Sequence, residues 1–495
     1  MKIRSLHLEN YRCFDKFDIV FDDDLTVLVG VNGSGKTAVL DAVAAFLQRF
    51  MDLLSESDDV VRKIKFDAVN RKMFDVSDLR IRAPKWIICH YTIVEERYRK
   101  GQPFSMAYGG MLNKGGDVIE MVPAEKTGGE YCLYGKRGKK GEGYVITEER
   151  ALAPLLHLYQ QCEERTKYPD GRHPQCEKCL ETGRCATSIF VQYSPQRSLS
   201  TKIEQTSTTA KNRVVFAPDL DFQASFEWFK TKNIAEALKR SDTQEKDYRN
   251  LELTVVRDAI SQALGNDGNI YEFPHMDGGE DGQSLKLVIN HRESGITYEV
   301  RQLSDGYRTM LALVIDMARR MAVANRHIKW PEKQSVLHSP GIVLIDEVEL
   351  HLHPSWQQTV LPKLREIFPC VQFIVTTHSP QVLTTVAAKH IRVLERSGEG
   401  FKAEPPEFSP LAHEPGDALT RIMGAQRHPE SSLRESIREY EQLVREGREN
   451  SVEASGLRKT LVETGYQIHE SDLANWRLLA KWRATRCQHD GEQTP

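Results

Sequence analysis

An eight-residue segment near the start of the chain, GVNGSGKT at residues 30–37, restricts the fold more than any other feature. It follows an apolar run at residues 25–29 and precedes a stretch with the apolar spacing of a helix, through about residue 54. The pattern G-x-x-x-x-G-K-[ST] between a strand and a helix is a phosphate-binding loop. The sequence therefore predicts an α/β fold with a parallel core sheet, in which an anion binds at the N-terminus of the helix.

The residue types of this loop fit ATP and Mg²⁺. Glycines let the backbone curl so that its amides point at phosphate oxygens. Lys36 can then reach the outer phosphates, while the hydroxyl of Thr37 ligates magnesium. The predicted nucleotide contacts in the loop are Asn32, Gly33, Ser34, Gly35, Lys36 and Thr37.

A second segment, IVLIDE at residues 342–347, ends an apolar run with two carboxylates. Four branched apolar residues in a row are typical of a central parallel strand. Asp346 at its C-terminal end can hold magnesium, and Glu347 can polarise the water that attacks the γ-phosphate. An acidic pair after a strand can also be a solvated turn, but the phosphate loop upstream favours the catalytic interpretation.

A third segment, TTHSP at residues 376–380, follows another apolar strand. His378 at that strand end can hydrogen bond to the γ-phosphate and sense its presence. Taken alone, such a residue would more often be an ordinary loop histidine. Its setting after the apolar strand favours a second catalytic residue beside Glu347.

The fourth segment, LSDGYR at residues 303–308, predicts a second anion site. Ser304 and Gly306 lie at a predicted helix N-terminus. Because one nucleotide cannot use two such sites on the same lobe, we expect a head-to-tail homodimer with each nucleotide between Lys36 of one protomer and Ser304 of the other. The alternative is an N-cap serine without a ligand.

The stretches LSDGYR, IVLIDEVELHLHP and TTHSPQ resemble ABC-type ATPases of the SMC, RecF and OLD kind, in which they serve in turn as the signature, the Walker B segment with its D-loop, and the switch histidine. The stretches LENYRCF, QYSPQRS, DFQASFEWF and LTRIMGAQRHP resemble more closely the ATPase subunit of Septu and retron-associated bacterial anti-phage systems. The resemblance makes Gln196 the Q-loop contact to magnesium and water, with Gln192 as a competing position. It places His351 and His353 near the dimer seam, as structural or D-loop contacts rather than metal ligands.

The resemblance also implies partners. It predicts an ATP-binding and slowly hydrolysing subunit that regulates a separate HNH nuclease, and a reverse transcriptase with its noncoding RNA and DNA as a further partner. OLD-type proteins continue into a nuclease module, whose acidic pattern the tail of this chain lacks. Two alternatives stay open: a RecF-like DNA repair or maintenance ATPase that acts directly on DNA, and a nucleotide-gated scaffold without turnover.

Changes in composition predict four regions. They are an ATPase head lobe (1–125), an insertion (126–186), the rest of the head with a helical lobe (187–400) and a helical C-terminal region (401–495). In the last region, the stripe of Leu473, Trp476, Leu479 and Trp482 could dock a partner or pack against its own chain.

The insertion contains a cysteine group with metal-ligand character: Cys162, Cys176, Cys179 and Cys185. Four thiolates could close a structural zinc site, but only one C-x-x-C is present, so free thiols are the alternative.

Composition argues against a strongly basic nucleic-acid-binding protein and against a membrane-spanning protein. The 67 basic residues nearly balance the 70 acidic ones, for a net charge of -3, so only local patches such as the basic run at residues 136–140 are candidates for nucleic-acid contact. That run is also typical of a solvated loop. The sequence contains no long uncharged apolar segment, and its odd number of cysteines fits a reducing compartment, which predicts a cytoplasmic protein without a membrane span.

Overall fold

The computed structural model describes residues 1–55, 86–94, 103–111, 144–147, 186–195, 216–217, 222–243, 248–264, 275–277, 286–292, 294–303, 305–325, 335–398, 400–426 and 433–491. The chain forms two compact units, Met1–Met423 and Gly424–Pro495.

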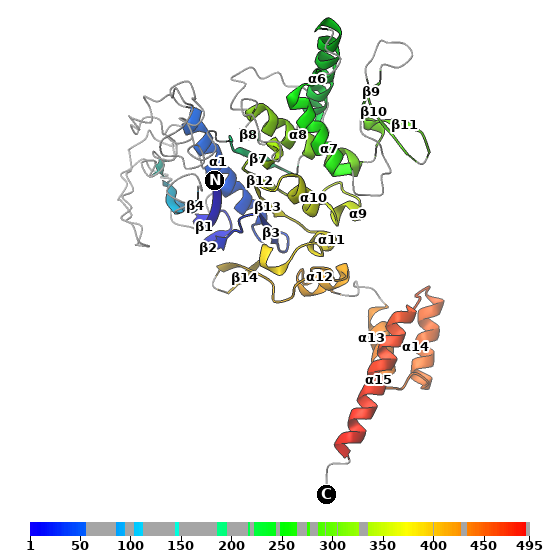
Figure 1. The fold of residues 1–495 in the computed structure, drawn as a ribbon. Coiled ribbons are helices and arrows are strands. Elements are labelled where there is room, and N and C mark those ends of the chain that lie inside the picture. The colour runs from blue at the N-terminus through cyan, green and yellow to red at the C-terminus, as the bar shows by residue number, and fades with distance from the viewer. Residues whose placement is uncertain are drawn as a thin grey trace. The chain divides into compact units, whose positions relative to one another are not determined.

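A sheet of mostly parallel strands forms the centre of the first unit (Figure 1). In the described residues its strands are β3 (Leu25–Val29), β7 (Ile189–Tyr193), β8 (Phe216–Ala217), β12 (Gly341–Ile345), β13 (Val371–Thr376), β14 (Ile391–Ser397) and β15 (Gly400–Glu404). The order is β15-β14-β3-β13-β12-β7-β8, and each neighbouring pair is parallel except β14 with β15. Strands β3, β12 and β13 are buried at every position, as central parallel strands are. The predicted α/β fold is confirmed.

Alternate residues of β12 bury on opposite faces of this sheet. Val343 and Ile345 belong to one apolar core, and Ile342 and Leu344 to another. Because both faces are apolar, each needs its own cover. Helix α1 (Lys36–Ser55) contributes to the core on the second face, where the predicted helix after the phosphate loop begins and ends within a residue of expectation.

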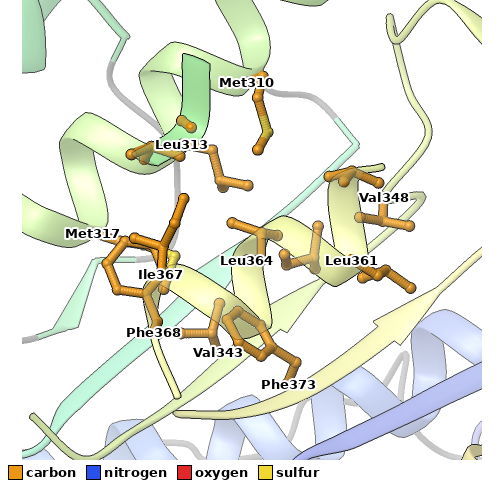
Figure 2. Close-up of a cluster of buried hydrophobic side chains, with 14 of the residues drawn as sticks. Met310, Leu313, Met317, Val343, Val348, Leu361, Leu364, Ile367, Phe368 and Phe373 are labelled. Carbon is orange, nitrogen blue, oxygen red and sulfur yellow. The ribbon is translucent and has the colours of Figure 1, made fainter. Parts of the chain in front are cut away.

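Helices α6 (Phe222–Thr243), α7 (Leu251–Leu264), α8 (Asp305–Ala324) and α10 (Val360–Ile367) supply the core on the first face. Figure 2 shows α8 and α10 packed over β12 and β13 through Met310, Leu313, Met317, Leu361, Leu364, Ile367, Val343 and Phe373. Truncating one such side chain to alanine typically costs about 2–5 kcal/mol. This packing fixes the start of α8 relative to the end of β12, and both of these ends carry predicted site residues.

An antiparallel sheet completes the N-terminal part of the first unit. Its strands among the described residues are β1 (Lys2–Tyr11), β2 (Phe14–Val20), β4 (Trp86–Val94), β5 (Pro103–Met111) and β6 (Tyr144–Thr147), in the order β2-β1-β4-β5-β6. β6 falls within the predicted insertion and pairs with β5. A small sheet has the order β11-β10-β9, from β9 (His275–Asp277), β10 (Lys286–Asn290) and β11 (Thr297–Glu299).

Short helices connect these elements. They are η6 (Val300–Gln302), η7 (Val336–His338), α9 (Pro354–Gln357), α11 (Pro380–Leu383), η8 (Ala388–His390) and α12 (Pro415–Arg421). None of the helices in the described residues is long and apolar enough to cross a bilayer.

The first unit extends further than the predicted boundary at residue 401. Strand β15 crosses that position and pairs with β14, so it belongs to the central sheet. Ala418 of α12 also lies in the apolar core of this unit. The division therefore falls between Met423 and Gly424.

The second unit consists of α13 (Arg434–Arg445), α14 (Val452–Glu463) and α15 (Glu470–Gly491), with an apolar core of its own. Ile437, Tyr440 and Val444 face that core, as their helical spacing predicts. Trp476 is only 5% exposed and packs in the same core. Trp476 therefore follows the alternative of packing against its own chain, while the side chain of Trp482 lies outside the described residues.

Candidate nucleotide-binding site

The phosphate loop runs from the end of β3 into the first turn of α1. Gly33 and Gly35 have φ values of +80° and +92°, a region that favours glycine. A Cβ atom on Gly35 would lie 2.3 Å from the ring of Phe14, and one on Gly30 would lie 2.6 Å from the carbonyl oxygen of Leu394. The glycines thus meet both a conformational and a steric requirement.

Lys36 turns its ammonium group back over this loop. Its Nζ donates to the carbonyl oxygens of Gly30 at 2.8 Å and Val31 at 3.1 Å. Burial lowers the pKa of Lys36, and the negative charges of Asp346, Glu347 and Glu349 oppose that shift. The cation therefore lies at a point where three carboxylates converge, which is the charge arrangement of a site for a phosphate with a metal ion. 

Ser34 adds a polar atom that points into the loop. Its side chain is buried, and its Oγ forms no hydrogen bond with any described residue. A buried hydroxyl without a partner is costly, so such groups indicate a ligand or a functional role. The loop thus fits a phosphate oxygen, which would accept this hydrogen bond.

Asp346 is held between the phosphate loop and β13. The hydroxyl of Thr37 donates to its Oδ2 at 2.8 Å, and the hydroxyl of Thr376 donates to its Oδ1. Its own N–H donates to the carbonyl oxygen of Tyr193 at 2.9 Å. Thr37 and Asp346, the two predicted magnesium ligands, lie together, and an oxygen pair of this kind suits Mg²⁺.

Glu347 has a strained backbone. Its φ of +49° is uncommon for a residue with a side chain. Its N–H donates to the hydroxyl of Thr376 at 2.7 Å, and this bond helps to hold the unusual conformation. Such strain concentrates at functional sites, which supports the role predicted for the Glu347 carboxylate.

Glu349 belongs to the same site, although the sequence interpretation did not include it. Its Oε2 accepts a hydrogen bond from the hydroxyl of Thr377 at 2.7 Å, and its Oε1 accepts one from the N–H of His378 at 2.6 Å. The imidazole of His378 is exposed to solvent. The signal that could have identified Glu349 is the third carboxylate in DEVE, two positions after Glu347.

The start of α8 lies against residues 351–353, in the segment ELHLHP (349–354) that is predicted as the D-loop. A Cβ atom on the buried Gly306 would approach the nitrogen of His353 at 3.2 Å and the carbonyl oxygen of His351 at 3.4 Å. His353 caps α9 by accepting from the N–H of Ser355, while His351 has a φ of +65°. Among the described residues, no group of three or more His, Cys, Asp or Glu side chains is arranged to hold a metal ion. Ser304 lies outside the described residues.

Some predicted residues cannot be placed. Gln196 and all four candidate zinc cysteines lie outside the described residues. The competing Gln192 lies on β7, where its side-chain amide donates to Oδ1 of Asp41 at 3.0 Å, while Arg12 binds the other oxygen of Asp41. Gln192 thus links β7 to α1.

A family model described as AAA ATPase domain matches residues 1–253 of the 495. The chain belongs to this family. A second model, described as an AAA domain and named for the AbiEii toxin of type IV toxin–antitoxin systems, matches residues 199–384. The two matches together include the phosphate loop, the acidic pair after β12 and His378. This AAA-family chain is an ATPase.

Curated relatives agree with this assignment. The Retron Vc95 probable ATPase of Vibrio cholerae serotype O1 biovar El Tor is 27% identical to this chain, over 93% of this chain and 87% of the relative's own length. The Septu protein PtuA of Bacillus mycoides is 39% identical over 20% of this chain and 13% of its own. The predicted relation to retron and Septu ATPases is confirmed. Among solved structures, the SMC head domain from Thermotoga maritima is similar over 82% of this chain and all of its own, with 14% identity and a TM-score of 0.36.

Proposed function

We propose that the chain binds ATP between two copies of itself, hydrolyses it slowly and thereby controls a partner nuclease in a bacterial anti-phage defence complex. The observation that carries the nucleotide chemistry is the hydrogen-bonded series Thr37–Asp346–Thr376, which joins the phosphate loop to the ends of β12 and β13. The defence role rests on the relatives of the retron and Septu kind.

Each residue of the site has a task in this proposal. The buried hydroxyl of Ser34 and the ammonium of Lys36 hold phosphate oxygens, and Thr37 with Asp346 would hold magnesium. A bound Mg²⁺ would neutralise charge on the outer phosphates. Glu347 orients and polarises the attacking water. His378 donates a hydrogen bond to the γ-phosphate, and Gln196 contacts the magnesium and the water.

The second copy completes the site. In the facing protomer, Gly306 lies in the first turn of α8, and Ser304 precedes that helix in the sequence; the helix N–H groups and the helix dipole at this end favour an anion. ATP would then hold the two heads together, and loss of the γ-phosphate would release them. Such a change in assembly is a physical signal that a bound nuclease can respond to.

Mixing two inactive variants tests the shared site. Lys36→Ala and Ser304→Arg should each abolish hydrolysis as homodimers. A heterodimer retains one intact site, so an equal mixture should recover about one quarter of the wild-type rate if protomers exchange freely and sites act independently. Ser294→Arg, the same change on an exposed turn, is the matched control and should retain full activity. No recovery in freely exchanging mixtures would contradict the head-to-tail arrangement.

Affinity purification from the native host tests the defence role. We expect an HNH nuclease to copurify with the tagged chain, together with a reverse transcriptase and its RNA and DNA, and Lys36→Ala should abolish protection against phage. Tight DNA binding by the isolated chain that weakens steeply with salt, without a copurifying nuclease, would instead favour a direct role in DNA maintenance.

We also propose a structural zinc ion for the cysteine group at Cys162, Cys176, Cys179 and Cys185. Tetrahedral thiolate coordination would stabilise a segment with little apolar content. Metal analysis of the purified chain should return about one zinc per protomer. Metal-free protein with an unchanged unfolding transition would refute the site.

A further inference from the structure

Glu349 bridges two loops that come together only in the folded protein. It follows β12, while Thr377 and His378 follow the adjacent parallel strand β13. Each carboxylate oxygen of Glu349 accepts one hydrogen bond from these residues, at 2.7 Å and 2.6 Å. Hydrogen bonds to an ionised acceptor are roughly twice as strong as neutral ones, so the carboxylate holds the His378 backbone firmly.

The backbone of Glu349 is tied to the D-loop at the same time. Its carbonyl oxygen accepts from the N–H of Leu352 at 2.9 Å, which closes a turn that contains the left-handed His351. Gly306, in the first turn of α8, packs against this turn. A shift of that turn is therefore transmitted through one residue to the loop that carries the switch histidine.

A second link leads from the same turn to the same loop. The hydroxyl of Ser379 donates to the side-chain oxygen of Gln357 at 2.6 Å, and the amide of Gln357 donates to the carbonyl oxygen of Leu352 at 2.9 Å. Glu349 makes the link that ends on His378 itself. The negative charge of Glu349 also contributes to raising the pKa of Lys36.

We propose that Glu349 is a positioning residue for hydrolysis. It fixes the backbone of His378 and thereby sets the direction of the His378 imidazole. Through its own backbone it also couples that direction to the position of the D-loop turn against which α8 packs. The inference rests on the role of His378 in the proposed function. The carboxylate of Glu349 acts through His378 and does not touch the reacting atoms.

The test uses the full-length chain and combines a geometric with a kinetic measurement. In Glu349→Gln, the amide of His378 loses a charged acceptor, so hydrogen exchange of a peptide that covers residues 371–383 should accelerate. ATP affinity should change by less than about twofold, while kcat falls by about tenfold or more, the pattern for loss of an interaction made in the transition state. Glu366→Gln removes the same charge at an exposed position on α10 and should match the wild type in both measurements.

Double variants separate positioning from other roles. Glu349→Gln combined with His378→Ala should turn over at the rate of His378→Ala alone, because the carboxylate acts through the histidine. Thr377→Val removes one of the two hydrogen bonds to Glu349, together with the bond that the Thr377 hydroxyl accepts from the N–H of Ser379 at 3.0 Å. It should lower kcat less than Glu349→Gln, and Thr377→Ser should retain the wild-type rate. Thr377→Val also provides the test if Glu349→Gln folds poorly.

Two results would overturn the inference. Multiplicative loss in the Glu349→Gln, His378→Ala pair would show that Glu349 acts independently of the histidine. If Glu349→Gln turns over normally while His378→Ala is impaired, the role of Glu349 is refuted and that of His378 stands. If His378→Ala also turns over normally, the proposed role of His378 is refuted as well.

Discussion

The phenol hydroxyl of Tyr193 donates a 2.9 Å hydrogen bond to Oδ2 of Asp316 in the buried space between β7 and α8. Arg320 donates to the same oxygen at 2.6 Å, and Ser225 of α6 donates to Oδ1 at 3.2 Å. Because the carbonyl oxygen of Tyr193 also accepts from the N–H of Asp346, one tyrosine joins the backbone of Asp346 to helices α6 and α8.

Removing the Asp316 carboxylate should destabilise the first unit strongly. Asp316→Ala leaves the buried guanidinium of Arg320 without its carboxylate, and breaking such a pair typically costs about 3–5 kcal/mol. Tyr193→Phe removes one neutral donor to this carboxylate and should cost less, about 1.5–3 kcal/mol. Urea unfolding measures both. Equal effects of the two variants would contradict the central role assigned to the ion pair.

The same carboxylate predicts a pH dependence of stability. Burial raises the pKa of Asp316, but the charges of Arg320 and Arg319 outweigh that effect and hold the pKa below the usual 3.8. A depressed pKa means that the carboxylate stabilises the fold above pH 3.8 and loses this contribution as the pH falls through the lowered value. The stability difference between wild type and Asp316→Asn should stay constant from neutral pH to about 5 and shrink below about 4. A difference that disappears near pH 6 would instead point to a histidine.

Two glycines of the phosphate loop should respond differently to alanine. Gly33 has a positive φ but open space around its Cβ position, so Gly33→Ala should cost about 1 kcal/mol of backbone strain. Gly35→Ala adds a collision with Phe14 to the same kind of strain and should cost more, with loss of ATP binding. Calorimetric titration with ATP and urea unfolding distinguish the two. Gly35→Ala with normal ATP affinity would contradict the loop geometry.

Thr376 should affect catalysis through its hydroxyl. It donates to Asp346 and accepts from the N–H of Glu347, so it holds both acidic residues of the site. Thr376→Val removes both hydrogen bonds at nearly constant shape and should lower kcat by about tenfold or more while raising the Mg²⁺ concentration needed for half-maximal rate. Thr376→Ser keeps the hydroxyl and serves as the control. An unchanged Mg²⁺ dependence in the valine variant would refute this role.

The parts of the site that lie at strand ends could be predicted from the sequence. β3, β12 and β13 are mostly apolar runs, and parallel strands bring their carboxyl ends to one edge, so the sequence predicts that Lys36, Asp346 and His378 lie together. Glu349 was missed because its partners are 28 residues away or more and depend on which strands are neighbours. The sequence alone does not separate the third carboxylate of DEVE from an acidic residue in a solvated turn.

The tail illustrates another limit of periodicity. The spacing of Leu473 and Trp476 identifies an apolar helix face, but it cannot tell whether that face meets its own chain or a partner. The answer depends on α13 and α14, whose Tyr440 and Leu461 share a core with Trp476.

Because the unit from Gly424 onwards buries its own tryptophan and tyrosine, its integrity does not depend on the head's interior. A recombination that exchanged this unit between chains would therefore leave the apolar core of the nucleotide-binding unit intact.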